Sequence, residues 1–162
     1  MSFGDRNPYD SNQRIFDIAI RVIEDSRKFI TTFDIPYVGG SSKSGKHVYR
    51  DHLTPSGYTS KKSGKWVDTD KYIRLHEIIE KILLDAGLSY LLAHQFATQM
   101  EYAAVQADGH DLEEYDEITQ EWCKEAAERA RYHSPNDIED RPYIECNDQA
   151  IIDKMIPVTV EV

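Results

Sequence analysis

The sequence predicts a mostly helical α+β protein with a central antiparallel helix hairpin and a small antiparallel sheet at one side. Two observations support this prediction. Four segments repeat apolar residues at the spacing of an amphipathic helix, and one stretch between them has glycine, serine and proline around short β-prone pieces instead. A length of 162 residues fits one domain, so residues 1–162 are expected to fold together.

The first predicted helix covers residues 11–33. Asp10 and Gln13 have the spacing of a helix start. Apolar residues then recur at helical intervals, at Ile15, Ile18, Ala19, Val22, Ile23, Phe29, Ile30 and Phe33. Residues 36–68 follow as a small β/loop region, because short β-prone pieces alternate there with glycine, serine, lysine and proline.

The central hairpin is predicted from helices over residues 70–86 and 89–108. Gly87 is typical of a helix end and Ser89 of a helix start. The short link forces the two helices to run antiparallel. The first helix is apolar nearly all round, which predicts a buried position. The packed side of the second helix is expected to hold Leu91, Leu92, Phe96, Met100, Ala103 and Ala104.

A fourth helix is predicted over residues 111–132. Asp111 and Glu114 resemble a capping box, and Ser134-Pro135 ends the helical pattern. Residues 134–162 are expected to form an extended C-terminal tail, with a short helix near Asp148–Met155 and a strand-like VTVEV end.

Charge and hydropathy limit the possible partners. The net charge of −10 disfavours nucleic acid or anionic membrane as a partner of the whole molecule. No apolar run approaches the roughly 20 residues of a membrane span, no secretory signal is evident and the two cysteines form no metal or disulfide motif. We therefore expect a cytoplasmic protein. Positive charge gathers in residues 36–67, at Lys43, Lys46, Arg50, Lys61, Lys62 and Lys65 against one carboxylate, Asp51.

The strongest chemical signal is the HEIIE pattern of residues 76–80, in the middle of the predicted buried helix. His76 and Glu80 lie one helical turn apart and can bind one divalent ion. Glu77 is turned by about 100° and can take a proton from a metal-bound water. This division of roles is the chemistry of a zinc hydrolase.

The third ligand is expected from the second helix of the hairpin. Pairing positions across the short turn sets Glu101 opposite His76, which makes Glu101 the predicted third ligand. His94 falls one turn nearer the hairpin end, where we expect it to orient Glu80 and, as an alternative, to bind the metal itself.

HEIIE followed by Glu101 resembles the gluzincin class of zinc metallopeptidases over residues 66–109. The resemblance implies a peptide or protein substrate, with His76 and Glu101 as ligands and Glu77 as general base. Glu80 stands where the class has a second histidine, and Val105 where it often has an acid. The harder donor set keeps manganese, magnesium and iron open beside zinc. The chain is also similar to small uncharacterised bacterial and phage proteins.

Two further hypotheses remain open. Tyr49 and His52 alternate along a predicted strand ahead of the site, where one of them could contact substrate or an oxyanion; a solvent-facing strand end is the competing interpretation. The competing function is a non-enzymatic binding or assembly protein of phage or prophage type. Its basic segment 36–67 would contact a partner or nucleic acid, and HEIIE would be only a buried polar cluster.

Overall fold

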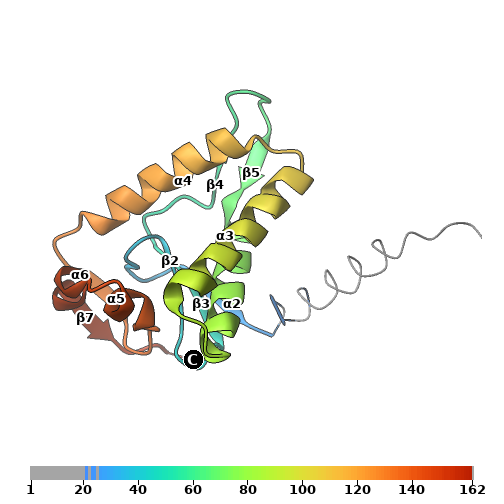
Figure 1. Ribbon diagram of the computed structural model, residues 1–162. Coiled ribbons are helices and arrows are strands. Elements are labelled where there is room, and N and C mark those ends of the chain that lie inside the picture. The colour runs from blue at the N-terminus through green and yellow to red at the C-terminus, as the bar shows by residue number, and fades with distance from the viewer. Residues whose placement is uncertain (1–20, 22, 25, 162) are drawn as a thin grey trace, which may run out of the picture.

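The computed structural model describes residues 21, 23–24 and 26–161. The predicted α+β class is confirmed, with helices dominant and strands in small sheets of two or three (Figure 1). The long helices of the described part are α2 (Thr69–Asp85), α3 (Tyr90–Ala107) and α4 (Leu112–Ala127). As predicted, α2 and α3 form an antiparallel hairpin, and α2 also contacts strands, which places it at the centre of the fold.

Local sequence explains where these helices begin and end. The Ser89 side chain accepts a hydrogen bond from the Leu92 N–H, and the Asp111 side chain accepts one from the Glu114 N–H. Gly87 has a φ of 98°, a left-handed conformation that glycine adopts without steric cost, and it ends the first arm of the hairpin. We expected the fourth helix to reach residue 132. Helix α4 ends at Ala127 instead, and Tyr132 is the first residue of a strand.

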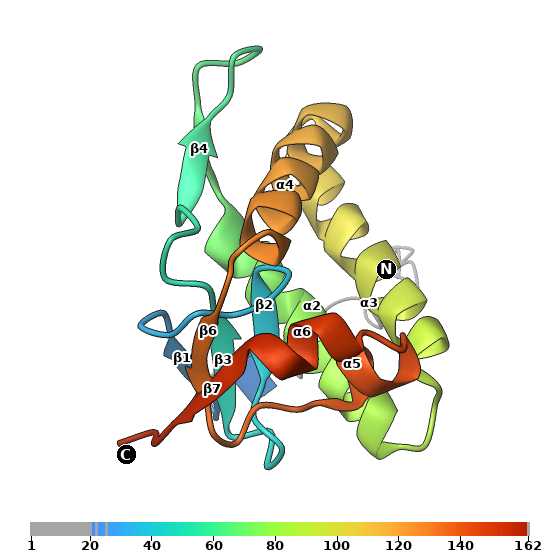
Figure 2. The same cartoon turned by 90° about the vertical axis from the view of Figure 1, so that its left-hand side faces the viewer.

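The predicted β region contains two separate sheets. Strand β3 is central in the first, pairing antiparallel with β2 and parallel with β1, and β4 pairs antiparallel with β5 in a hairpin that projects from the body (Figure 2). The strands are β1 (Lys28–Ile30), β2 (Gly39–Ser41), β3 (His47–Arg50), β4 (Gly57–Thr59) and β5 (Trp66–Asp68). We expected a single antiparallel sheet. That prediction is wrong in two details, because the strands form two sheets and β1 pairs in parallel with β3.

The predicted helix over residues 11–33 is wrong at its C-terminal end. Residues 21, 23 and 24 are helical, but Lys28–Ile30 is strand β1. Phe29 and Ile30 satisfy the helical period by sequence alone, yet pairing with the buried strand β3 prevails. The rest of that prediction, over residues 11–20, lies outside the described residues.

The C-terminal segment is not an extended tail. Strand β6 (Tyr132–Pro135) pairs in parallel with β7 (Met155–Val158), and α5 (Arg141–Glu145) and α6 (Gln149–Lys154) lie between them. Helix α6 matches the short helix expected near residue 148, while the strand precedes most of the VTVEV end. The segment packs against the body of the protein because its apolar side chains are buried in a shared core. That core contains Ile35, Tyr49, Tyr132, Ile138, Tyr143 and Ile151.

The predicted packed side of α3 is wrong in its N-terminal half, while Met100 and Ala104 are half-buried and Ala104 packs against the core as predicted. Leu91, Leu92 and Phe96 are 66%, 48% and 51% exposed, whereas Ala93 and Ala97 are fully buried. The two small alanines allow α2 to approach closely, so the larger apolar residues face outward. No helix in the described part of the chain is long and apolar enough to cross a membrane.

Candidate metal centre

Three potential metal ligands converge where α2 and α3 face each other. His76 Nε2 donates to Glu80 Oε2 at 3.1 Å, and His94 Nδ1 donates to the same oxygen at 2.9 Å. One ligand atom from each residue lies within 4.8 Å of the others. His76 and Glu80 are buried, while the His94 side chain is 44% exposed. One cation could bind at this point, with the two imidazole nitrogens and the shared carboxylate oxygen as its ligands.

Glu101 lies on the other side of the His76 ring. Nδ1 of His76 donates to Glu101 Oε2 at 2.7 Å, and the Tyr115 hydroxyl donates to Glu101 Oε1 at 2.6 Å. Glu101 therefore holds the ring so that Nε2 faces Glu80. This is the geometry of a carboxylate that orients a metal-binding histidine. The structure brings all four predicted residues together, but His94 shares the oxygen of Glu80 and Glu101 does not.

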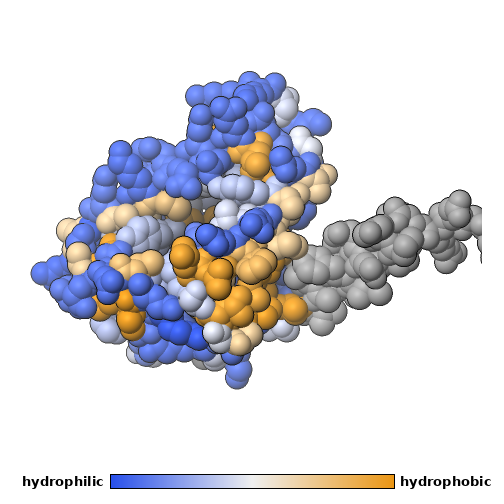
Figure 3. All heavy atoms as spheres, in the orientation of Figure 1, coloured by the Kyte–Doolittle hydropathy of each residue, from blue (hydrophilic) through white to orange (hydrophobic). Residues whose placement is uncertain are grey.

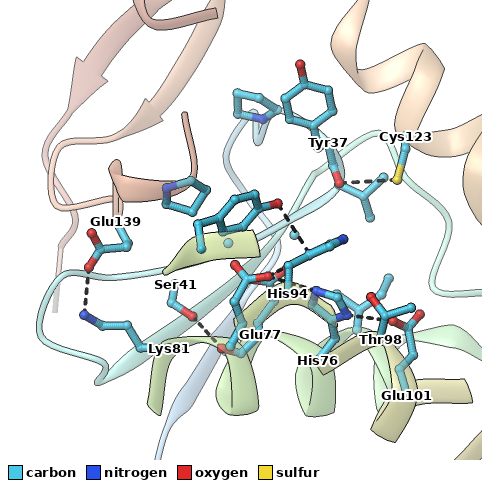
Figure 4. A pocket seen from close by; sticks show the side chains of 18 of the residues that line it. Tyr37, Ser41, His76, Glu77, Lys81, His94, Thr98, Glu101, Cys123 and Glu139 are labelled. Carbon is cyan, nitrogen blue, oxygen red and sulfur yellow. Dashed lines mark hydrogen bonds and ion pairs between the residues drawn. The ribbon is translucent and has the colours of Figure 1, made fainter. Parts of the chain in front are cut away.

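The cluster opens into a cavity of about 380 Å³ (Figure 4). Its walls come from β2, from one face of each of α2, α3 and α4, and from α5. Figure 4 shows the Glu77 carboxylate and the rings of His76 and His94 close together on one side of it. A small ligand that enters the cavity would thus meet both the histidines and a carboxylate.

Glu77 lies against the backbone of β2. A Cβ added to Gly39 would come within 2.5 Å of Glu77 Oε1, so only glycine leaves room for this carboxylate. Among the described residues, none donates a hydrogen bond to the Glu77 side chain. Burial and the neighbouring Glu80 carboxylate raise the pKa of Glu77 to about 8. At neutral pH the group is therefore mostly protonated while no cation is bound, and a nearby cation would lower its pKa and free the carboxylate to accept a proton.

The electrostatics of the cluster favour a positive charge at its centre. Burial alone would lower the pKa of His76, but its hydrogen bonds to Glu101 and Glu80 hold that pKa well above the usual value. Burial would likewise raise the pKa of Glu80, but the hydrogen bonds from His76 and His94 lower it. In this form the His76 imidazolium supplies positive charge beside Glu80, and a divalent cation bound there could supply it instead.

The donor set fits a catalytic zinc ion. Two imidazole nitrogens and one carboxylate oxygen are a known ligand set of such sites, which keep a fourth position for water or substrate. Donors about 2.0–2.2 Å from a tetrahedral ion lie about 3.3–3.6 Å apart. The separations of 3.1 and 2.9 Å around Glu80 Oε2 need only small side-chain movements to reach that spacing.

The structure does not bring Tyr49 and His52 to this cavity. Tyr49 is fully buried in the core around Ile35, and its hydroxyl donates to Asp137 Oδ1 at 2.6 Å. His52 lies two residues beyond the end of β3, with Nε2 2.7 Å from Asp34 Oδ1. Val48 and Tyr49 of β3 are buried and do not line the cavity, so these side chains belong to the core.

Strand β2 is an edge strand of its sheet and lines the cavity. Asp51 N–H donates to the Val38 carbonyl and Ser42 N–H to the His47 carbonyl. Because hydrogen-bonded pairs alternate along an antiparallel ladder, Gly39 and Ser41 turn their N–H and C=O groups away from β3. The Ser41 carbonyl accepts the Glu139 N–H at 2.8 Å, and no described residue bonds to the outward groups of Gly39.

Sequence reasoning missed the aromatic walls of the cavity, which include Tyr37, Tyr90 and Tyr143. Tyr37 stacks on Tyr143 with ring centroids 6.4 Å apart, and its hydroxyl donates to Asp148. Tyr37 and Val38 both have positive φ, at 61° and 83°. A left-handed β-branched residue is rare, and such strain gathers at functional sites. No local pattern in the sequence marks these residues.

The basic segment 36–67 is partly neutralised by carboxylates. Arg50 Nε lies 2.8 Å from Asp70, and Lys62 Nζ lies 3.0 Å from Asp111. Lys43 pairs more loosely, at 3.6 Å from Asp140. These contacts reduce the positive field that the sequence alone predicts, and they tie the segment to the body of the protein.

Comparison of the chain with protein-family models, with curated proteins and with solved structures finds no match. The resemblance to gluzincins therefore remains a prediction, and function has to be argued from the site.

Proposed function

We propose that the protein is a metal-dependent hydrolase, with zinc as the favoured ion and a peptide or protein as substrate. The observation that carries the proposal is the convergence of His76, Glu80 and His94 on one point beside the Glu77 carboxylate. A zinc ion bound there would lower the pKa of a water molecule and polarise a substrate carbonyl.

The residues of the chain then divide the work. Glu77 accepts a proton from the water as its oxygen forms a bond to the carbonyl carbon, and it passes this proton to the leaving amine as the C–N bond breaks. Glu101 orients His76, and the Tyr115 hydroxyl in turn holds Glu101. His94 completes the ligand set from α3.

The outward groups of Gly39 support a peptide as the substrate class. An extended peptide can add to the edge of β2 through main-chain hydrogen bonds. Gly39 lines the cavity next to Glu77, so a peptide bonded there would present its backbone to the proposed base. The tyrosines that line the cavity would contact its side chains.

Metal content and activity together test the proposal. Protein purified without chelator is expected to hold close to one transition-metal ion per chain, which His76→Ala and His94→Ala remove. His133→Ala should keep the ion, because this exposed histidine lies outside the cluster. The wild type should cleave labelled casein or blocked dipeptides, and a chelator should stop it. A wild type that binds neither zinc nor manganese would favour the non-enzymatic binding protein instead.

A further inference from the structure

The part of the chain that the structure describes leaves an apolar face of the α2–α3 hairpin uncovered, on the side away from the metal centre. Leu92 and Phe96 lie one turn apart on α3 and are about half exposed, and Ile82 of α2 is 37% exposed. Leu75 and Ile79 continue the α2 stripe at helical spacing, half-buried. We call these five residues the hairpin face. Figure 3 shows hydrophobic residues gathered over the hairpin, next to the start of the described chain.

The N-terminal part of the chain begins its path beside this face. The Glu24 carbonyl accepts a hydrogen bond from Arg74 Nη2 at 3.3 Å, and Arg74 directly precedes Leu75 on α2. The Arg74 guanidinium also lies over the Phe29 ring, 5.2 Å from its centroid. Glu24 therefore lies at one end of the apolar stripe.

The length of the segment matches the face. At 1.5 Å per residue, a helix over residues 11–23 is about 20 Å long, and the stretch of α2 from Arg74 to Ile82 is about 12 Å long. The segment can thus cover the whole stripe, starting from Glu24.

The sequence of residues 11–23 also fits the apolar hairpin face. Ile15, Ile18, Ala19, Val22 and Ile23 recur at the spacing that forms one apolar face of a helix. We propose that residues 11–23 pack as an amphipathic helix on the hairpin face and cover its exposed apolar side chains. The occupant is this segment of the same chain, not a second copy.

Limited trypsin digestion tests the docking, because Arg14 and Arg21 lie within the segment. Phe96→Asp places a charge on the hairpin face and is expected to speed cleavage at both arginines by roughly 10- to 100-fold, as expected from the loss of one buried aromatic side chain. Gln106→Asp, an exposed position nearer the other end of α3, should leave the rate unchanged.

A second variant separates docking from damage to the fold. Ile18→Asp should speed cleavage as much as Phe96→Asp, and the double variant should be no faster than either single one, because both remove the same contact. Equal cleavage of wild type and Phe96→Asp would overturn the proposal, and so would full additivity in the double variant. Light scattering provides the remaining outcome: a wild-type dimer that Phe96→Asp converts to a monomer would assign the face to a second copy.

Discussion

The imidazole of His76 donates through Nδ1 to Glu101, and this contact decides which nitrogen is left to face Glu80. A ring held in this way cannot flip without losing a 2.7 Å hydrogen bond to a carboxylate. The contact favours the alternative in which His94 is a ligand, because a carboxylate on Nδ1 orients its histidine while the donors around Nε2 can share an ion. His94 thereby becomes the third proposed ligand.

The two residues on α3 should differ in their effect on metal affinity. His94→Ala removes a proposed ligand, whereas Glu101→Gln keeps a hydrogen-bond acceptor for His76 and removes only charge. We expect Glu101→Gln to weaken binding by about 10- to 100-fold, as changes behind a ligand do, and His94→Ala to weaken it more. Competition titration with a chelating indicator measures both. A larger loss of metal affinity in Glu101→Gln than in His94→Ala would instead make Glu101 the ligand.

Glu77→Gln should retain the metal and the fold but lose hydrolysis. The amide preserves the shape of the side chain yet cannot take a proton, which costs roughly two to four orders of magnitude in kcat. Glu80→Gln is the matched control, since it should lose metal affinity first. If Glu77→Gln released the ion while Glu80→Gln kept it, the assignment of base and ligand would be wrong.

Gly39→Ala should reduce activity without removing the metal. The new methyl group would lie 2.5 Å from Glu77 Oε1 and must displace the carboxylate. Gly40→Ala is the control on the same strand, because its Cβ would meet the flexible end of Ile138 at an acceptable 3.4 Å. Rates and metal content of the two variants, measured side by side, check this prediction. Equal activity would mean that the position of Glu77 does not matter.

Glu139 should make stability depend on pH in the acid range. Burial would raise its pKa, but hydrogen bonds from Arg141 and Lys81 prevail and hold the pKa at about 2. A lowered folded-state pKa stabilises the native state above the unfolded value of about 4.3 and loses that effect as pH falls towards 2. The contribution at neutral pH is on the order of 3 kcal/mol, because the group is buried.

Urea unfolding of Glu139→Gln checks this contribution. The variant should be less stable than the wild type at pH 7, and the difference should shrink as the pH is lowered from 4.3. Glu121→Gln, at an exposed position of α4, should behave like the wild type throughout. A difference that stays constant with pH would show that the carboxylate charge is not responsible.

Local patterns explain why the hairpin could be predicted from the sequence. Helix periodicity, Gly87 and Ser89 fix two helices and a short turn, and the turn forces the segment around His76 to meet the segment around Glu101. The finer choice between His94 and Glu101 depends on helix rotation. One residue changes the direction of a side chain by about 100°, and an uncertainty of one residue in the turn is enough to exchange their roles.

The parallel strand pairs could not be predicted in the same way. Strand β1 pairs with β3 and β6 with β7 only because intervening segments fold back, and three or four residues carry too little pattern to specify such a partner. The prediction of which α3 residues are packed was wrong for a related reason. A large apolar residue and an alanine both satisfy the helical period, and only the close approach of α2 selects the alanines.

The cavity also has an order of assembly. Glu80 and His94, which share one hydrogen bond, are 14 residues apart in the chain, whereas Tyr37 and Asp148, which join two walls of the cavity, are 111 residues apart. Contacts between near neighbours in sequence form at a smaller loop-closure cost and therefore earlier during folding. We therefore expect the donor atoms to meet first during folding and the aromatic walls to close around them afterwards.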